Sequence, residues 1–64
     1  MNTQPTQPIL VTVDETAAML SIGRTAAWEL VRKQKLKSVK IGRTRRVPVS
    51  VIQEYIQRLL DEAA

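Results

Sequence analysis

The 64-residue chain has no cysteine, no histidine and no phenylalanine, and only one tryptophan and one tyrosine. Without cysteine or histidine it can form no disulfide and no zinc finger, and it has no imidazole for acid–base catalysis. No apolar run approaches the roughly 18 residues of a membrane span, and the first residues lack the apolar core of a signal peptide. These absences predict a cytoplasmic domain with no metal, no organic cofactor and no membrane contact.

The length allows one small domain with a marginal core. Chains of this size bury only ~60% of the surface that they expose when unfolded. Residues 1–8 contain two prolines and no apolar periodicity, so we expect a disordered tail there and a folded domain over 9–62. The available serine and acidic side chains have no imidazole partner, and so small a domain has little room for a pocket. We therefore expect the protein not to be an enzyme.

Basic and acidic residues are concentrated in different parts of the chain. Nine of the ten lysines and arginines lie between Arg24 and Arg46, where Glu29 is the only acid, so this window carries a net charge of +8. The remaining residues have one arginine and five acids, a net charge of −4. Such segregation indicates a cationic face for a polyanion, most commonly DNA or RNA. Two aromatic side chains are few for stacking splayed RNA bases, which favours duplex DNA.

Two short helices are predicted in the first half of the folded region. Thr12 and Glu15 form a capping-box pattern ahead of a helix over about 13–20, which residues 21–23 end. A second helix is predicted from about 24 to 33, with Gly23 as a weak N-cap. Two short helices joined by a three-residue turn that contains glycine make a helix-turn-helix.

Apolar residues alternate with polar ones on both sides of Gly42, over 36–41 and again before Pro48. This period of two predicts a β-hairpin with Gly42 in its turn and Pro48 at the end of its second strand. A β-prone run over 9–11 predicts a further short strand.

The last third of the chain predicts a helix that runs to about Asp61. Ser50 and Gln53 form a second capping-box pattern, and an apolar stripe follows. We expect this stripe to cover the core on the side away from the nucleic acid; it consists of Ile52, Tyr55, Ile56, Leu59 and Leu60. The predicted fold class is therefore mainly α with a small β-hairpin, a winged helix-turn-helix: short strand, helix, turn, recognition helix, two-stranded wing and C-terminal helix.

Four segments, over 10–20, 24–32, 35–43 and 46–48, resemble the excisionase-like, MerR-related helix-turn-helix domains of phage excisionases and AlpA-type regulators. The stretch from Ile41 to Pro48 is the most specific part. The chain departs from the family pattern at three positions: it has Ser21 and Gln34 where the family usually ends its first and second helices with glycine, and Gly23 where the family usually has a serine cap.

The resemblance implies a small architectural protein that binds repeated DNA sites, bends DNA and sets the direction of a site-specific recombinase (integrase). We favour this excisionase function, in the nucleoid of a prokaryote or on phage DNA. One alternative is a transcriptional regulator of a mobile element with the same domain. Another is a protein-interaction module whose DNA binding is incidental. Because one small module contacts little DNA, we also expect cooperative self-association on repeated sites.

The candidate DNA-binding residues fall into two sets. Those of the recognition helix are Arg24, Thr25, Trp28, Glu29 and Arg32, with Lys33 at its end. Those of the wing are Lys40, Arg43, Thr44, Arg45 and Arg46, which suit a narrow minor groove. Arginine can pair with guanine and glutamate with the cytosine amino group.

Each set also has a plainer interpretation. Both faces can simply be solvated, Glu29 can pair with Lys33, and Trp28 can be a partly buried core aromatic. On the second strand of the hairpin we expect Val47 in the core and Arg46 more outward than Arg45.

Overall fold

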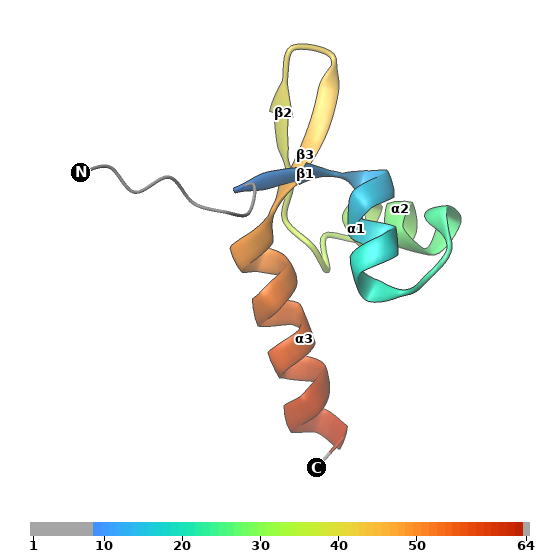
Figure 1. Ribbon diagram of the computed structural model, residues 1–64, viewed down its shortest axis with the longest axis vertical. Helices are drawn as coiled ribbons and strands as arrows, with labels where there is room; N and C mark the ends of the chain where they lie inside the picture. The colour runs from blue at the N-terminus through green and yellow to red at the C-terminus, as the bar shows by residue number, and fades with distance from the viewer. Residues whose placement is uncertain (1–8, 64) are drawn as a thin grey trace, which may run out of the picture.

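The computed structural model describes residues 9–63, so the tail expected over 1–8 lies outside the described residues. The elements follow one another as β1 (Leu10–Thr12), α1 (Val13–Leu20), α2 (Arg24–Arg32), β2 (Val39–Ile41), β3 (Thr44–Pro48) and α3 (Val49–Ala63) (Figure 1). This order confirms the predicted winged helix-turn-helix. The first strand lies one residue later than its β-prone run suggested, and the last helix continues to Ala63.

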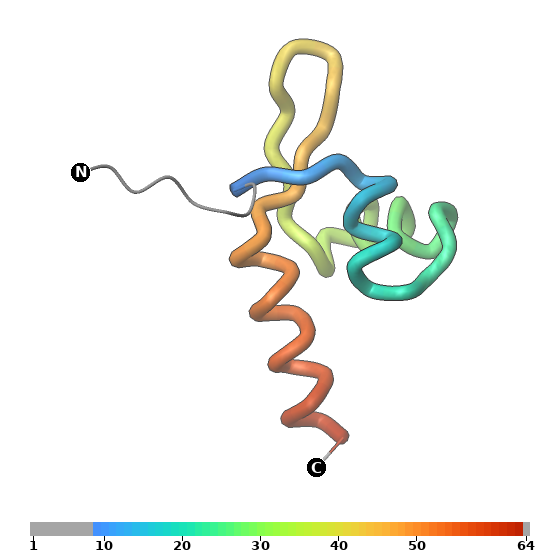
Figure 2. Tube along the Cα trace, in the orientation of Figure 1, coloured from blue at the N-terminus to red at the C-terminus, as the bar shows by residue number. Residues whose placement is uncertain are grey.

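A small antiparallel sheet joins the N-terminal strand to the wing. Its strand order is β1-β3-β2, so β3 is central and β1 covers the edge of the hairpin nearest the helices. Val11 pairs with Val47, and Lys40 pairs with Arg45. The Cα trace shows the blue N-terminal segment crossing the base of the yellow hairpin (Figure 2). The sequence predicted the hairpin but not this third partner. Beyond the end of β1, β2 and β3 extend alone as the wing.

Glycine is favoured at the tip of the wing. Gly42 has a φ of 62°, in the left-handed region that other residues adopt at a cost. Next to it the Thr44 hydroxyl donates to the Ile41 carbonyl at 3.0 Å, which ties the two ends of the turn together. The wing therefore has a locally determined tip.

Both ends of α1 are defined by hydrogen bonds. The predicted capping box is present: the Thr12 amide donates to Glu15 Oε1 at 2.8 Å, and the Glu15 amide donates to Thr12 Oγ1 at 3.0 Å. The helix ends at Ser21, which adopts φ 57°, and the Ile22 amide donates to the Ala17 carbonyl at 2.9 Å. Ser21 is therefore the C-cap of α1, and it acts through its backbone rather than its hydroxyl. Gly23 is the N-cap of α2 and makes no side-chain bond.

The core lies where α1, α2, the sheet and the start of α3 meet. Its buried residues are Val11, Val13, Ala17, Ala27, Val31, Leu36, Val47 and Ile52. Thr16 is buried among them, and its hydroxyl donates to the Thr12 carbonyl at 2.9 Å, so its polar group is satisfied. This packing fixes α2 and the wing relative to each other.

The predicted serine cap of α3 is wrong. The helix begins at Val49, directly after β3, and Ser50 is an exposed residue of its first turn. The Val49 amide donates instead to the Ile9 carbonyl at 2.9 Å. Because β3 runs straight into the helix, the chain has no separate residue that could act as a side-chain cap.

The stripe on α3 covers the core only at its beginning. Ile52 is fully buried and Tyr55 is half-buried, but Leu59 and Leu60 are 45% and 59% exposed. The distal half of α3 projects away from the other elements (Figure 1). The expectation that the whole stripe covers the core is therefore wrong, because the core is too small to reach it. Within residues 9–63 no helix is both long enough and apolar enough to span a membrane.

Candidate nucleic-acid interface

The helix α2 separates its core face from its exposed face. Ala27 and Val31 are buried, whereas Arg24, Thr25 and Arg32 are exposed. Trp28 stands at the flank and is 40% exposed, so it is neither a core residue nor fully solvated. The second helix of the helix-turn-helix thus presents the polar face that a groove-reading helix needs.

Arg24 is held in place by a residue of α1. Its Nε donates to Asp14 Oδ1 at 2.9 Å, and its Nη2 donates to Asp14 Oδ2 at 3.2 Å. Both side chains are more than half exposed, so the pair contributes little to stability. Its two-point geometry does restrict the orientation of the guanidinium. The sequence analysis did not predict this contact, because Asp14 and Arg24 are ten residues apart and belong to different helices.

Glu29 lies between two cations of the same helix. Its carboxylate is 3.4 Å from Arg32 Nη2 and 3.8 Å from Lys33 Nζ. The plainer interpretation, a pair with Lys33, is therefore observed, and Arg32 joins it. Glu29 thus lowers the positive charge of the exposed face in the absence of DNA.

The wing exposes most of its predicted residues, namely Lys40, Arg43, Thr44 and Arg45. Arg46 is half-buried, and its Nη1 donates to the Arg45 carbonyl at 3.4 Å. The expectation that Arg46 points further outward than Arg45 is wrong. Arg46 is flanked by Thr12 on β1 and by Val39 on β2, whereas Arg45 has a neighbour only on β2. Arg45 and Val47 lie on the same face of β3. That face is buried at Val47, but it is exposed to solvent at Arg45, because β1 does not extend that far.

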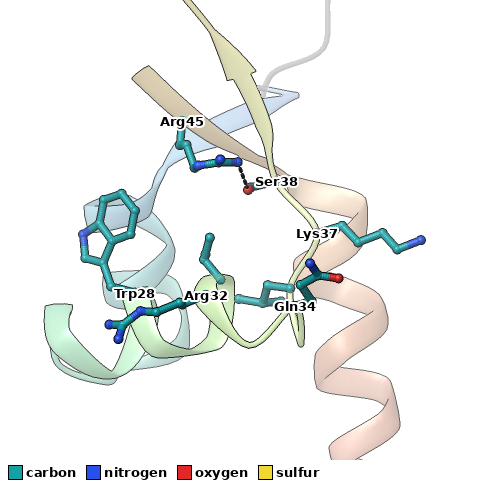
Figure 3. Close-up of a pocket in the computed structure, with 8 residues that line it drawn as sticks. Trp28, Arg32, Gln34, Lys37, Ser38 and Arg45 are labelled. Atoms are coloured by element: carbon teal, nitrogen blue, oxygen red, sulfur yellow. Dashed lines mark hydrogen bonds between the residues drawn. The ribbon is translucent and has the colours of Figure 1, made fainter. Parts of the chain in front are cut away.

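A groove separates α2 from the wing (Figure 3). We call it the helix–wing groove; its volume is about 570 Å³, and it is lined by Trp28, Val31, Arg32, Gln34, Leu36, Lys37, Ser38 and Arg45. In it Arg45 Nη1 donates to Ser38 Oγ at 3.0 Å. The structure therefore brings Trp28 and Arg32 of the helix set onto the same groove as Arg45 of the wing set. Arg43 and Thr44 lie at the far end of the wing, where Ile41 pairs with Thr44.

Comparison with known proteins agrees with this architecture. Residues 10–59 match a family described as a helix-turn-helix domain. The chain belongs to this helix-turn-helix family. It is 43% identical over 56 residues to an excisionase of Streptomyces ambofaciens, an alignment that covers 88% of this chain and 90% of the relative. It is 44% identical over 52 residues to a "probable excisionase" of Saccharopolyspora erythraea, covering 81% of this chain and 53% of that protein. No solved structure gave a significant match.

Charge in this helix-turn-helix domain follows the fold. Nine of its ten basic residues lie between the start of α2 and Arg46 in β3, with Glu29 as the only acid. Over α3 the balance reverses, because Arg58 is accompanied by Glu54, Asp61 and Glu62. The positive charge that can attract a polyanion is therefore carried by α2 and the wing, and not by the projecting helix α3.

Proposed function

We propose that the protein is an excisionase, a sequence-specific DNA-binding protein that controls the direction of site-specific recombination. The observation that carries this proposal is the 43% identity with the Streptomyces ambofaciens excisionase, which extends over 90% of that protein. The charge-sorted surface of α2 and the wing supports it physically, since this is the part of the domain that can attract DNA. We assign no catalytic step to the chain and leave strand exchange to a recombinase.

In the proposed complex α2 enters the major groove and the wing enters the adjacent minor groove. Arg24 and Arg32 are the candidates for guanine, and Glu29 for a cytosine amino group. Arg43 at the wing tip is the candidate for the minor groove, where a narrow groove concentrates negative potential. Thr25, Lys33, Lys40 and Thr44 supply further contacts, chiefly to the backbone. Arg46, held in the sheet, contributes charge rather than a base contact.

Self-association on DNA is part of the proposal. A single module of this size buries roughly 600–1,000 Å² of its surface against DNA, which is a small interface for tight binding. The distal half of α3 projects away from α2 and the wing (Figure 1). It carries exposed apolar residues, namely Ile56, Leu59 and Leu60. They offer a surface for a second copy or for the recombinase while the opposite side of the domain holds DNA. Binding to repeated sites on a prokaryotic or phage chromosome would use both surfaces.

A plasmid recombination assay tests the proposal. The plasmid holds the two attachment sites that flank the integrated element, and the element's own recombinase is supplied with or without the protein. We expect excised circles only when the protein is present, and far fewer with Arg43→Ala. Equal excision in its absence, together with repression of a promoter beside its binding site, would instead establish a transcriptional regulator.

A further inference from the structure

The helix–wing groove has a distinctive position in the fold. One wall comes from α2 through Trp28 and Arg32, and the other comes from the wing and its approach through Ser38 and Arg45 (Figure 3). In duplex DNA a sugar–phosphate strand separates each major groove from the adjacent minor groove. If α2 occupies one groove and the wing the next, that strand must pass across the helix–wing groove. This step rests on the proposed function.

The charges in the groove suit an anion. Arg32, Lys37 and Arg45 line it, although the Lys37 ammonium group points away from it (Figure 3), and none of its lining residues is acidic. Arg32 is already paired with Glu29, and Arg24 outside the groove with Asp14. Within residues 9–63 no carboxylate forms an ion pair with Arg45. Arg45 is thus a guanidinium whose charge is not neutralised by the domain itself.

Arg45 is nevertheless held in one orientation. Its Nη1 donates to Ser38 Oγ at 3.0 Å, while the other N–H groups of its guanidinium remain able to donate. Since Ser38 accepts this bond, its own hydroxyl hydrogen can be directed to a second acceptor. A phosphate oxygen beside the pair would receive one bond from arginine and one from serine. Charge-assisted bonds of this kind are stronger than neutral ones.

The floor of the groove is apolar. It contains Val31 and Leu36 from the core, and the half-exposed ring of Trp28 stands across the opening from Ser38. A bare inorganic anion gains nothing from such surfaces, whereas the deoxyribose attached to a backbone phosphate can pack against them. The combination of a cationic rim and an apolar floor therefore fits a sugar–phosphate unit better than a free ion.

We propose that the helix–wing groove is a seat for one backbone phosphate of the strand between the two DNA grooves, with Arg45 and Ser38 as its donors. The seat carries no sequence information. It sets the register of the recognition helix and the wing on the duplex, as backbone contacts do in other DNA complexes.

A scan with single methylphosphonates, each of which removes the charge of one backbone phosphate, tests the seat on the specific duplex. One phosphate contact contributes about 0.9 log units of affinity at 0.1 M salt, or ~8-fold. We expect one methylphosphonate between the two grooves to weaken binding of the wild-type protein by about this factor and binding of Arg45→Ala hardly at all. Ser38→Ala should show a reduced sensitivity at the same position.

Arg43→Ala is the matched control, because it removes the same charge from the far end of the wing. It should remain fully sensitive to that methylphosphonate. If Arg45→Ala loses as much affinity as the wild type at every substituted position, the seat is overturned while specific binding stands. If the wild type prefers no duplex over scrambled DNA, the proposed function fails and the seat fails with it.

A second measurement distinguishes a DNA phosphate from a free one. Trp28 is the only tryptophan, so its fluorescence reports on the helix–wing groove. We expect the specific duplex to change this fluorescence, and inorganic phosphate at millimolar concentration to leave it unchanged. Saturable binding of inorganic phosphate that Arg45→Ala abolishes would show a site for small anions and would overturn the proposal.

Discussion

Glu29 offers the sharpest test of how the surface balances attraction and specificity. Its carboxylate lies 3.4 Å from Arg32 Nη2 and 3.8 Å from Lys33 Nζ, so Glu29→Gln releases both cations. The net charge of the chain rises from +4 to +5. If the released charge makes one more phosphate contact, the salt dependence of binding steepens by about 0.9. At 0.1 M salt this corresponds to ~8-fold tighter binding to scrambled DNA.

The affinity of Glu29→Gln for the specific duplex should rise less than its affinity for scrambled DNA. A glutamate that accepts from a cytosine amino group contributes ~1–3 kcal/mol of discrimination, which glutamine loses at least in part. If that discrimination is lost in full, the ratio of specific to scrambled affinity should fall by about 5- to 150-fold. Thermal stability should hardly change, because exposed pairs within a helix contribute only ~0.3–0.5 kcal/mol each.

Fluorescence anisotropy with both duplexes, titrated over salt concentration, measures these quantities. Glu54→Gln is the matched control, since it makes the same chemical change on α3. The salt dependence of Glu54→Gln should equal that of the wild type. If Glu29→Gln and Glu54→Gln have equal salt dependence, Glu29 does not act on the face that meets DNA.

Three further predictions concern stability and are checked by thermal and urea unfolding. Thr12→Ala removes the capping box of α1 and should cost about 1 kcal/mol, or roughly 4–8 °C in Tm. Ile52→Ala removes the only fully buried residue of α3 among those described and should cost ~2–5 kcal/mol. Ser21→Gly should stabilise the domain by about 0.5–1 kcal/mol, because a left-handed conformation costs other residues ~1–2 kcal/mol and glycine returns only part of that as entropy of the unfolded chain.

Each of these has a contrary outcome. A Thr12→Ala variant as stable as the wild type would show that the cap contributes nothing. An Ile52→Ala variant that loses less than Leu59→Ala would place the anchor of α3 at its exposed end instead. Ser21→Gly is compared with Ser50→Gly, which puts glycine inside a helix and should destabilise. Loss of stability in both would contradict the assignment of Ser21 to the left-handed region.

The sequence was informative wherever structure is determined locally. The capping box at Thr12 and Glu15 and the turn at Gly42 act within four residues, and both are present in the structure. Ser21 and Gln34, where the resembling family usually has glycine, adopt φ values of 57° and 61°. The family pattern thus identified two left-handed positions that this chain fills with other residues.

Features that depend on tertiary contacts were not predictable in the same way. The Ser50 and Gln53 pattern indicated a cap, but the direct continuation of β3 into α3 left no place for one. Arg46 is half-buried because it pairs with Thr12, more than thirty residues earlier in the chain. The alternation of apolar and polar residues could not predict this pairing. The contact between Asp14 and Arg24 likewise joins two helices across a turn.

The most direct test of the central claim is binding by fluorescence anisotropy to short duplexes tiled across the DNA that flanks the protein's own gene, with scrambled duplexes as controls. We expect one tile, or a few repeated ones, to bind ~10³-fold or more tightly than the controls, with a steep dependence on salt. Equal, salt-sensitive binding to every duplex would contradict it, because the surface of α2 and the wing would then attract DNA without reading it.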